Sequence, residues 1–78
     1  MFRISVLDVA KTGAVFDDLA SCVVLPGEDG EISLLDFHQT IVACLKEGTI
    51  RIDNKKPIPI KKGIARAEKN KISVIIER

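Results

Sequence analysis

The chain has 78 residues, of which 46% are hydrophobic and 29% charged, and its formal net charge is +1. This length leaves room for one hydrophobic core, so we expect a single domain spanning residues 1–78. The longest apolar stretches are only a few residues, which excludes a membrane-spanning helix. The N-terminus has no basic region followed by an apolar run, so we expect no signal peptide.

The two halves of the chain differ in charge. Residues 1–45 carry a net charge of −5 and residues 46–78 a net charge of +6. Such asymmetry sometimes marks a nucleic-acid or partner surface. Attraction between the two halves of one small fold is the simpler interpretation, and we favour it because charge alone rarely identifies a site.

Four short stretches have an alternation of period two, which is typical of strands with one face on a core. The residues expected to face that core are Phe2, Ile4 and Val6, then Ile50 and Ile52, then Ile58 and Ile60, and finally Ile72, Val74 and Ile76. Most of them are β-branched, as a pleated and half-buried surface prefers. We therefore predict an all-β fold.

Turn signals separate these stretches at intervals of about ten residues, which indicates a sandwich or a barrel. They are Lys11-Thr12-Gly13, Pro26 to Gly30, Glu47-Gly48, Asp53-Asn54-Lys55, Lys62-Gly63 and Lys69-Asn70. Residues 56–61 should form an edge strand, because Pro57 and Pro59 cannot donate to a ladder. The lysines around them would also discourage that edge from pairing with another chain.

One stretch conflicts with the strand pattern. Leu34, Phe37, Ile41 and Leu45 follow a helical spacing within residues 33–48, and Gly48 could end such a helix. Local rules alone therefore predict a helix here.

The two cysteines, Cys22 and Cys44, stand among apolar neighbours. We expect each to be a small buried hydrophobic residue in a reducing compartment, since a secreted chain of this size usually has more cysteines. A disulfide is possible but nothing in the sequence supports it.

The groups that catalysis needs are missing from the sequence. His38 is the only histidine, and with Cys22 and Cys44 it has no zinc-site spacing. No Ser or Cys stands in a nucleophile arrangement with it. The Gly27 to Gly30 turn is acidic and would repel a phosphate, while Asp17-Asp18 stands beside a turn as an ordinary solvated pair. We expect no enzyme activity, no cofactor and no metal.

A small β-barrel that binds single-stranded nucleic acid is the alternative function. Its surface would use the basic side chains Lys55, Lys56, Lys61, Lys62, Arg66, Lys69 and Lys71. Such proteins stack bases on aromatic residues within a basic groove. Here Phe2, Phe16 and Phe37 all lie in the acidic half, away from these lysines, so we expect no nucleic-acid partner.

The stretch from Leu25 to Leu35 resembles the N-terminal β-sandwich domain of the epsilon subunit of F-type ATP synthases. Gly27, Gly30, Glu31, Leu35 and His38 match that family's motif in register, and further matches follow along the chain at Phe16, Leu45, Gly48, Ile52, Gly63, Glu68 and Asn70 to Val74. The family's Pro-Gly before the histidine is Asp36-Phe37 here, and its Ala-Pro after it is Gln39-Thr40. These changes remove a fixed φ and a glycine's freedom, so the loop before His38 is expected to differ in shape.

The resemblance implies a small two-sheet β-sandwich of about ten short strands, with strand rather than helix at His38 to Leu45. It implies a non-catalytic subunit of the central stalk, which binds gamma, contacts the c ring and supports the coupling of proton transport to ATP synthesis. Its location would be peripheral, at the cytoplasmic face of the bacterial inner membrane or the equivalent organelle compartment. The family usually adds a C-terminal helical hairpin, which the 78 residues do not include.

The resemblance also assigns candidate contacts. Those to the c ring are Asp29, Gly30, Glu31 and His38, of which Glu31 is the best candidate because the ring's loops commonly offer an arginine. Those to gamma are Ala10, Thr40, Ile41 and Val42. Each also has a simpler interpretation: Glu31 and His38 as surface side chains, Gly30 as a turn residue, and Ile41 and Val42 as ordinary packing.

Overall fold

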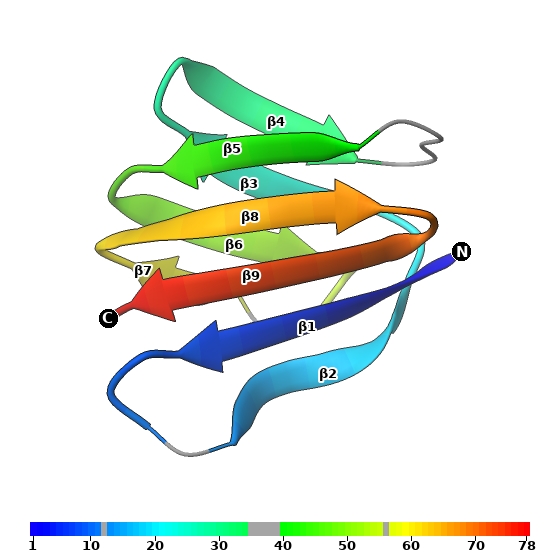
Figure 1. Cartoon of the computed structure of the whole chain (residues 1–78), viewed down its shortest axis with the longest axis horizontal. Helices are drawn as coiled ribbons and strands as arrows, with labels where there is room; N and C mark the ends of the chain where they lie inside the picture. Colours follow the sequence, from blue (N-terminus) through cyan, green and yellow to red (C-terminus); the bar gives the residue numbers. More distant parts are fainter. Residues whose placement is uncertain (12, 35–39, 56) are drawn as a thin grey trace.

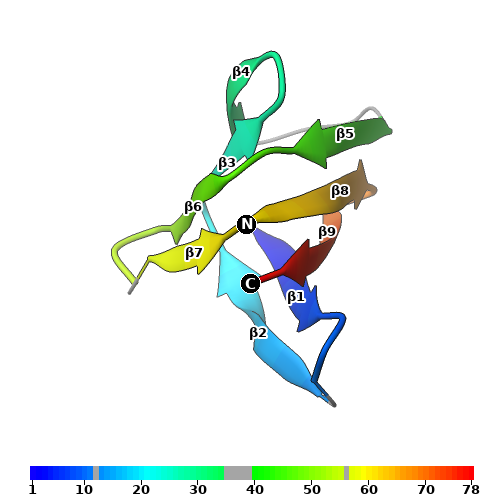
Figure 2. The same cartoon turned by 90° about the vertical axis from the view of Figure 1, so that its left-hand side faces the viewer.

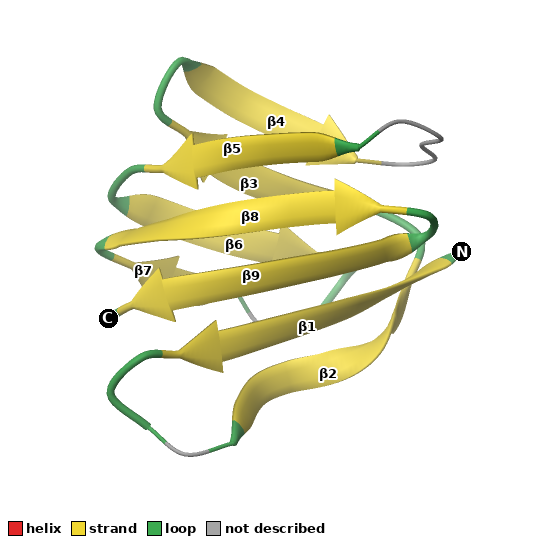
Figure 3. Cartoon of the chain, viewed as in Figure 1, coloured by secondary structure: helices red, strands yellow, loops and turns green. Residues whose placement is uncertain are grey.

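The computed structural model describes residues 1–11, 13–34, 40–55 and 57–78, and this part of the chain forms nine β-strands (Figures 1 and 3). They are β1 (Phe2–Asp8), β2 (Ala14–Ala20), β3 (Val23–Gly27), β4 (Gly30–Leu34), β5 (Ile41–Leu45), β6 (Gly48–Ile52), β7 (Ile58–Ile60), β8 (Lys62–Glu68) and β9 (Lys71–Glu77). The all-β prediction is confirmed. The described part contains no helix long and apolar enough to cross a membrane.

The strands form one curled sheet that folds into two layers. The front layer has the order β2-β1-β9-β8-β5, and the back layer has the order β4-β3-β6-β7. β3 joins them, because it pairs with β6 near Val23 and with β5 at Gly27. Figure 2 shows the two layers diverging from this junction. β1 and β9 run parallel, and the other pairs are antiparallel.

The core lies between the two layers and follows the predicted alternation. All ten residues expected to face it are at most 8% exposed. Seven further buried residues among those described complete it: Ala20, Val23, Leu25, Leu34, Leu45, Ala65 and Ala67. Each fully buried isoleucine or valine contributes about 1.5–3 kcal/mol, so this cluster supplies most of the stability of a chain with no disulfide.

Two tight hairpins and one aspartate fix the ends of the strands. Lys69 and Asn70 both have positive φ (47° and 62°), as the two-residue turn between β8 and β9 requires. Gly30 has a φ of +132°, which favours glycine where β4 begins. The Asp53 carboxylate accepts the Ser21 and Cys22 amide hydrogens at 3.1 and 2.8 Å, which ties the β6–β7 turn to the β2–β3 bend.

Tertiary pairing decides the conflict between helix and strand. Residues Ile41 to Leu45 form β5 and pair along their full length with β8, from Ala67 to Gly63. The strand prediction is therefore confirmed for this part, while Leu35 to Gln39, including His38, lie outside the described residues. The helical spacing arose because Leu34 and Leu45 approach one core from two different strands.

Three smaller expectations are wrong. Gly63 lies inside β8 rather than in a turn, and the bend is at Lys61. Asp17 and Asp18 lie within β2, where Asp17 forms an ion pair with Arg3 at 3.0 Å. Cys44 is exposed rather than buried, because it occupies an outward position of β5, and Cys22 is only half-buried. Local turn and neighbour rules do not reveal which face of a strand a residue occupies.

The predicted edge strand is confirmed for Ile58–Ile60, whereas Pro57 and Lys61 lie outside the strand. β7 pairs only with β6 among the described strands, and Pro59 faces Thr49 in that ladder. Lys56 lies outside the described residues.

Candidate functional site

The acidic turn between β3 and β4 brings together three of the four residues predicted to contact the c ring. Asp29 lies in the turn, and Gly30 and Glu31 are the first two residues of β4, all of them exposed. The turn is tight because Gly27 pairs directly with Gly30, and a Cβ at Gly27 would lie 2.6 Å from the Gly30 carbonyl oxygen. The turn is thus a fixed projection at one end of the sandwich (Figure 1). The fourth residue, His38, lies outside the described residues.

Glu31 already has a partner on the outer face of the back layer. Its Oε2 accepts a hydrogen bond from Arg51 Nη2 at 2.9 Å, and both side chains are more than half exposed. An exposed pair of this kind contributes only about 0–1 kcal/mol. It holds the Glu31 carboxylate in one orientation, while leaving it accessible.

The four residues predicted to contact gamma do not form one cluster. Thr40 and Val42 are exposed at the start of β5, with Val42 66% accessible, whereas Ile41 is half-buried and packs against the core. Ala10 is exposed in the turn after β1. Core packing therefore holds in part for Ile41, whereas Val42 lies in the β5–β8 ladder with its side chain outside the core.

A buried carboxylate holds the turn that carries Ala10. Asp8 is 5% exposed, and its oxygens accept hydrogen bonds from the Ala10 amide at 2.9 Å and from Arg78 Nε at 3.1 Å. The Ala10 amide first, and then the Arg78 guanidinium, lower the pKa of Asp8 below its ordinary value of 3.8. The stability that the carboxylate contributes is thus present above that ordinary value and is lost as the pH falls through the lowered pKa.

We predict that Asp8→Asn destabilises the domain at pH 7 and that its deficit against the parent shrinks as the pH falls below about 4. The amide side chain still accepts the Ala10 hydrogen bond but loses the attraction to Arg78. Urea unfolding midpoints at pH 7, 5 and 3 measure the effect. Arg78→Gln is the matched variant, and the Asp8 deficit should be smaller in its background. If the difference in stability between Asp8→Asn and the parent stayed constant with pH, the lowered pKa of Asp8 would be contradicted.

Sequence reasoning missed an apolar row across the outer face of the front layer. Leu7 of β1 neighbours Ile75 of β9, Ile75 neighbours Ile64 of β8, and Ile64 neighbours Cys44 of β5. Leu7, Ile75 and Ile64 are 43%, 49% and 55% exposed. The signal was present in the alternation, because Leu7 and Ile75 occupy positions that face away from the core.

A hollow of about 610 Å³ lies beside this row. Its lining includes Val9, Cys44, Ile64 and Ile75 together with charged side chains at its rim, such as Lys62 and Glu77. An apolar centre with a charged rim is the usual composition of a protein–protein interface. This row with its hollow, here called the front face, lies between Val42 and the Ala10 turn, so it links two of the predicted gamma contacts.

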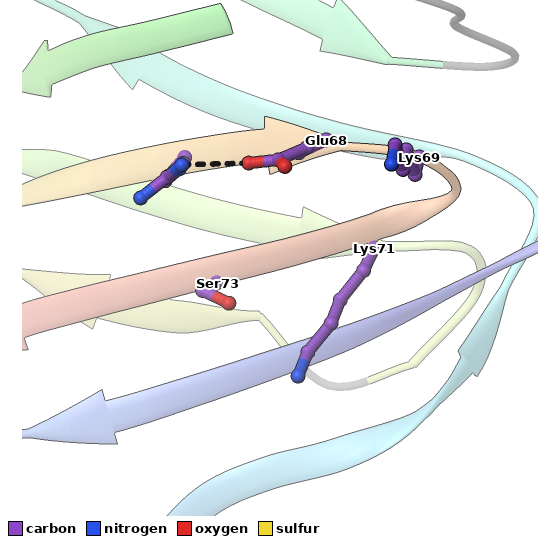
Figure 4. Close-up of a pocket in the computed structure, with 5 residues that line it drawn as sticks. Glu68, Lys69, Lys71 and Ser73 are labelled. Atoms are coloured by element: carbon purple, nitrogen blue, oxygen red, sulfur yellow. Dashed lines mark hydrogen bonds and ion pairs between the residues drawn. The ribbon is translucent and has the colours of Figure 1, made fainter. Parts of the chain in front are cut away.

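The basic side chains of the nucleic-acid alternative are spread over the molecule. Lys69 and Lys71 lie at the β8–β9 turn near Glu68 and Ser73 (Figure 4), whereas Lys61 and Lys62 lie at the opposite end of β8. Arg66 is paired with Glu68 at 2.7 Å, and Lys62 lies 3.7 Å from Glu77. Among the described aromatic residues, Phe2 is buried and Phe16 half-buried. The described residues therefore offer no exposed aromatic platform beside a basic groove.

The described residues also bring together no group of three or more His, Cys, Asp or Glu side chains that could hold a metal ion. What the described surface offers is an acidic turn and an apolar face, which suit binding to other proteins.

Comparison of the chain with known proteins identifies its family. Residues 3–78 match the family model described as ATP synthase, Delta/Epsilon chain, beta-sandwich domain. The chain is 34% identical over 73 residues to the ATP synthase epsilon chain of Campylobacter curvus, and 33% identical over 70 residues to that of Gloeobacter violaceus. These alignments cover 88% and 86% of this chain but 57% and 53% of the relatives, so the chain spans little more than half their length.

A solved structure agrees with the fold. The chain superposes with a TM-score of 0.77 on a chain of the mitochondrial ATP synthase central stalk and c ring from Tetrahymena thermophila, covering 99% of this chain and 63% of that one. The sequence identity there is 10%, so this match concerns the architecture alone. With the family model spanning nearly every residue, the chain belongs to the family of ATP synthase delta/epsilon chain β-sandwich domains.

Proposed function

We propose that this chain is a non-catalytic, epsilon-type component of the central stalk of a rotary F-type ATP synthase. The family match over residues 3–78 carries this proposal, and the relatives named as ATP synthase epsilon chains support it. Its role is mechanical: a stiff two-layered domain binds gamma, seats the stalk on the c ring and so supports the coupling of proton transport to ATP synthesis. The chain then lies peripherally, at the cytoplasmic face of the bacterial inner membrane or in the equivalent organelle compartment.

Gamma binds the front face in this proposal. The exposed row of Leu7, Ile75 and Ile64 would be covered by gamma, and the hollow beside it would take one apolar side chain as an anchor. Val42 and the Ala10 turn mark the ends of the contact.

We predict that Ile75→Lys weakens binding to the cognate gamma subunit at least about tenfold, because it places a charge at the centre of an apolar contact. Isothermal titration calorimetry measures the affinity, and circular dichroism checks that the variant stays folded. Thr49→Lys is the control, since Thr49 is exposed on β6 of the back layer. Equal affinity for both variants would move the gamma site away from the front face.

The c ring contacts the acidic turn in this proposal, with Glu31 orienting the contact. We predict that Glu31→Ala weakens retention of the c ring by the gamma complex by up to about fivefold, as the loss of one exposed ion pair allows. Arg51→Ala is the matched variant, because it breaks the same intramolecular pair but leaves the Glu31 carboxylate in place. Pull-down of the ring by the purified complex distinguishes them. If both variants behave alike, Glu31 acts only through Arg51.

A further inference from the structure

The edge of β5 that faces away from β8 is only partly paired by the described strands. It meets β3 at one position, where Leu45 faces Gly27, and two hydrogen bonds flank that position: Glu28 N to Cys44 O and Lys46 N to Pro26 O. Toward its start, β5 diverges from β3, whose first two positions, Val23 and Val24, pair with β6 (Figure 2). The first half of β5 therefore lacks a neighbour on this side among the described strands.

The direction of the backbone groups follows from these bonds. The N–H and C=O groups of one residue point to the same side of a strand, and successive residues alternate. Because Cys44 O is bonded to Glu28, the backbone of Val42 also points away from β8, whereas that of Ala43 points toward its partner Ala65. The Val42 amide and carbonyl thus have no ladder partner among the described strands on this side, and they can serve as a template for one more strand.

The other open edges of the described sheet carry features that discourage pairing. β7 contains Pro59, and β2 carries Asp17 and Asp18 beside a register shift in its ladder with β1. β4, which pairs only with β3 among the described strands, carries Glu31. Proteins protect their edge strands with such prolines, charges and bulges. The edge of β5 instead presents Val42 and Cys44, both exposed and uncharged. Because the described β5 edge lacks a proline, a charge or a bulge, we infer that another polypeptide segment covers it in the assembled complex.

The space beside this edge indicates what covers it. A hollow of about 490 Å³ lies between the acidic turn and β5, lined by Glu28, Asp29, Ile32 and Val42 among others. Glu28 and Asp29 form no ion pair with any described residue. A segment that enters this hollow contacts the backbone of β5 and the apolar side chains of Ile32 and Val42. At one end it meets the carboxylates of Glu28 and Asp29, which have no described ion-pair partner.

We propose that the β5 edge takes up an extended, basic segment of a protein partner as an additional strand of the front layer. The segment pairs with the backbone of Val42 and places a lysine or arginine near Glu28 and Asp29. This inference deepens the proposed function and rests on it in one respect: the partner in the assembly is the subunit that contacts Thr40 to Val42. Recognition through an added strand draws its affinity from main-chain hydrogen bonds.

Amide exchange measured by NMR tests the edge directly, first in the free chain. Val42 should exchange about 100-fold faster than Ala43, since only the Ala43 backbone faces β8. A Val42 amide that is already as slow as that of Ala43 would mean that the edge is occupied within the free chain or by a second copy, and would overturn the proposal.

The same measurement in the complex with the cognate gamma subunit separates the two proposals. Slowing of Val42 by about tenfold or more, with Ala43 unchanged, supports strand addition. A complex that forms with Val42 still fast overturns strand addition and leaves the stalk function standing.

If no complex forms, the stalk function fails, and an eight-residue peptide of alternating lysine and valine becomes the probe. Saturable slowing of Val42 by this peptide, abolished by Glu28→Lys with Asp29→Lys but kept in the control Glu47→Lys, supports the edge as a strand acceptor. No effect of the peptide overturns it.

Discussion

Ile72→Ala should lower the free energy of unfolding by about 2–5 kcal/mol, whereas Ile75→Ala on the same strand should change it by less than about 1 kcal/mol. Ile72 has no exposed surface and packs between the two layers, and Ile75 is 49% exposed on the front face. Removing the Ile72 side chain leaves a cavity that the flanking strands β1 and β8 hold open, because both are paired with β9 along most of its length. At position 75 water fills the space.

Urea unfolding of the parent and the two variants measures this difference. A domain of this size has a total stability of about 4–12 kcal/mol, so Ile72→Ala removes a large share of it. In thermal unfolding, each kcal/mol corresponds to a shift of about 4–8 °C. Equal losses for the two variants would mean that the two faces of β9 are not distinguished by burial as described. Ile75→Ala also serves the proposed function, because a stable variant with weaker gamma binding separates the interface from the core.

The alternation of the sequence predicts the strands and their inward faces because it reports a local physical preference. Phe2, Ile4 and Val6 could only be buried together if residues 2–8 were extended, and the structure has them so. Helical spacing, in contrast, misled at residues 33–48, because Leu34 and Leu45 reach one core from two different strands and so imitate a helix. The resemblance to a known family was needed there, since the ladder from Ile41 to Leu45 with β8 is a long-range contact that no local signal encodes.

Surface residues were harder to predict than core residues, because their neighbours also depend on long-range strand pairing. Cys44 has apolar neighbours in the chain, yet its side chain points outward beside Ile64. The front face exists only because the register aligns Leu7, Ile75 and Ile64 across three strands. The Asp8–Arg78 pair likewise joins residues from the two ends of the chain. Such surfaces depend on pairing between distant strands, whereas the acidic turn, which is contiguous in sequence, could be recognised from its residues.

Gly63→Ala should destabilise the domain by about 1–3 kcal/mol, although alanine is normally the better residue in a strand. Gly63 lies in β8 between Leu45 of β5 and Ile76 of β9. A Cβ at this position would lie 2.7 Å from the Ile75 carbonyl oxygen and 3.2 Å from Ile76 Cγ2. The oxygen belongs to the backbone of a strand that is paired on both sides, so it cannot move aside without disturbing the ladder.

The exposed position Thr49 on β6 supplies the control for this prediction. There Thr49→Ala should be more stable than Thr49→Gly by about 0.5–1 kcal/mol, which is the ordinary preference of a strand. At position 63 the order of alanine and glycine should be reversed in urea unfolding. A Gly63→Ala variant as stable as the parent would show that β8 and β9 adjust freely. The reversed order would establish that Gly63 is needed because three strands approach closely at this position. Local rules instead predict a turn here, from the pair Lys62-Gly63.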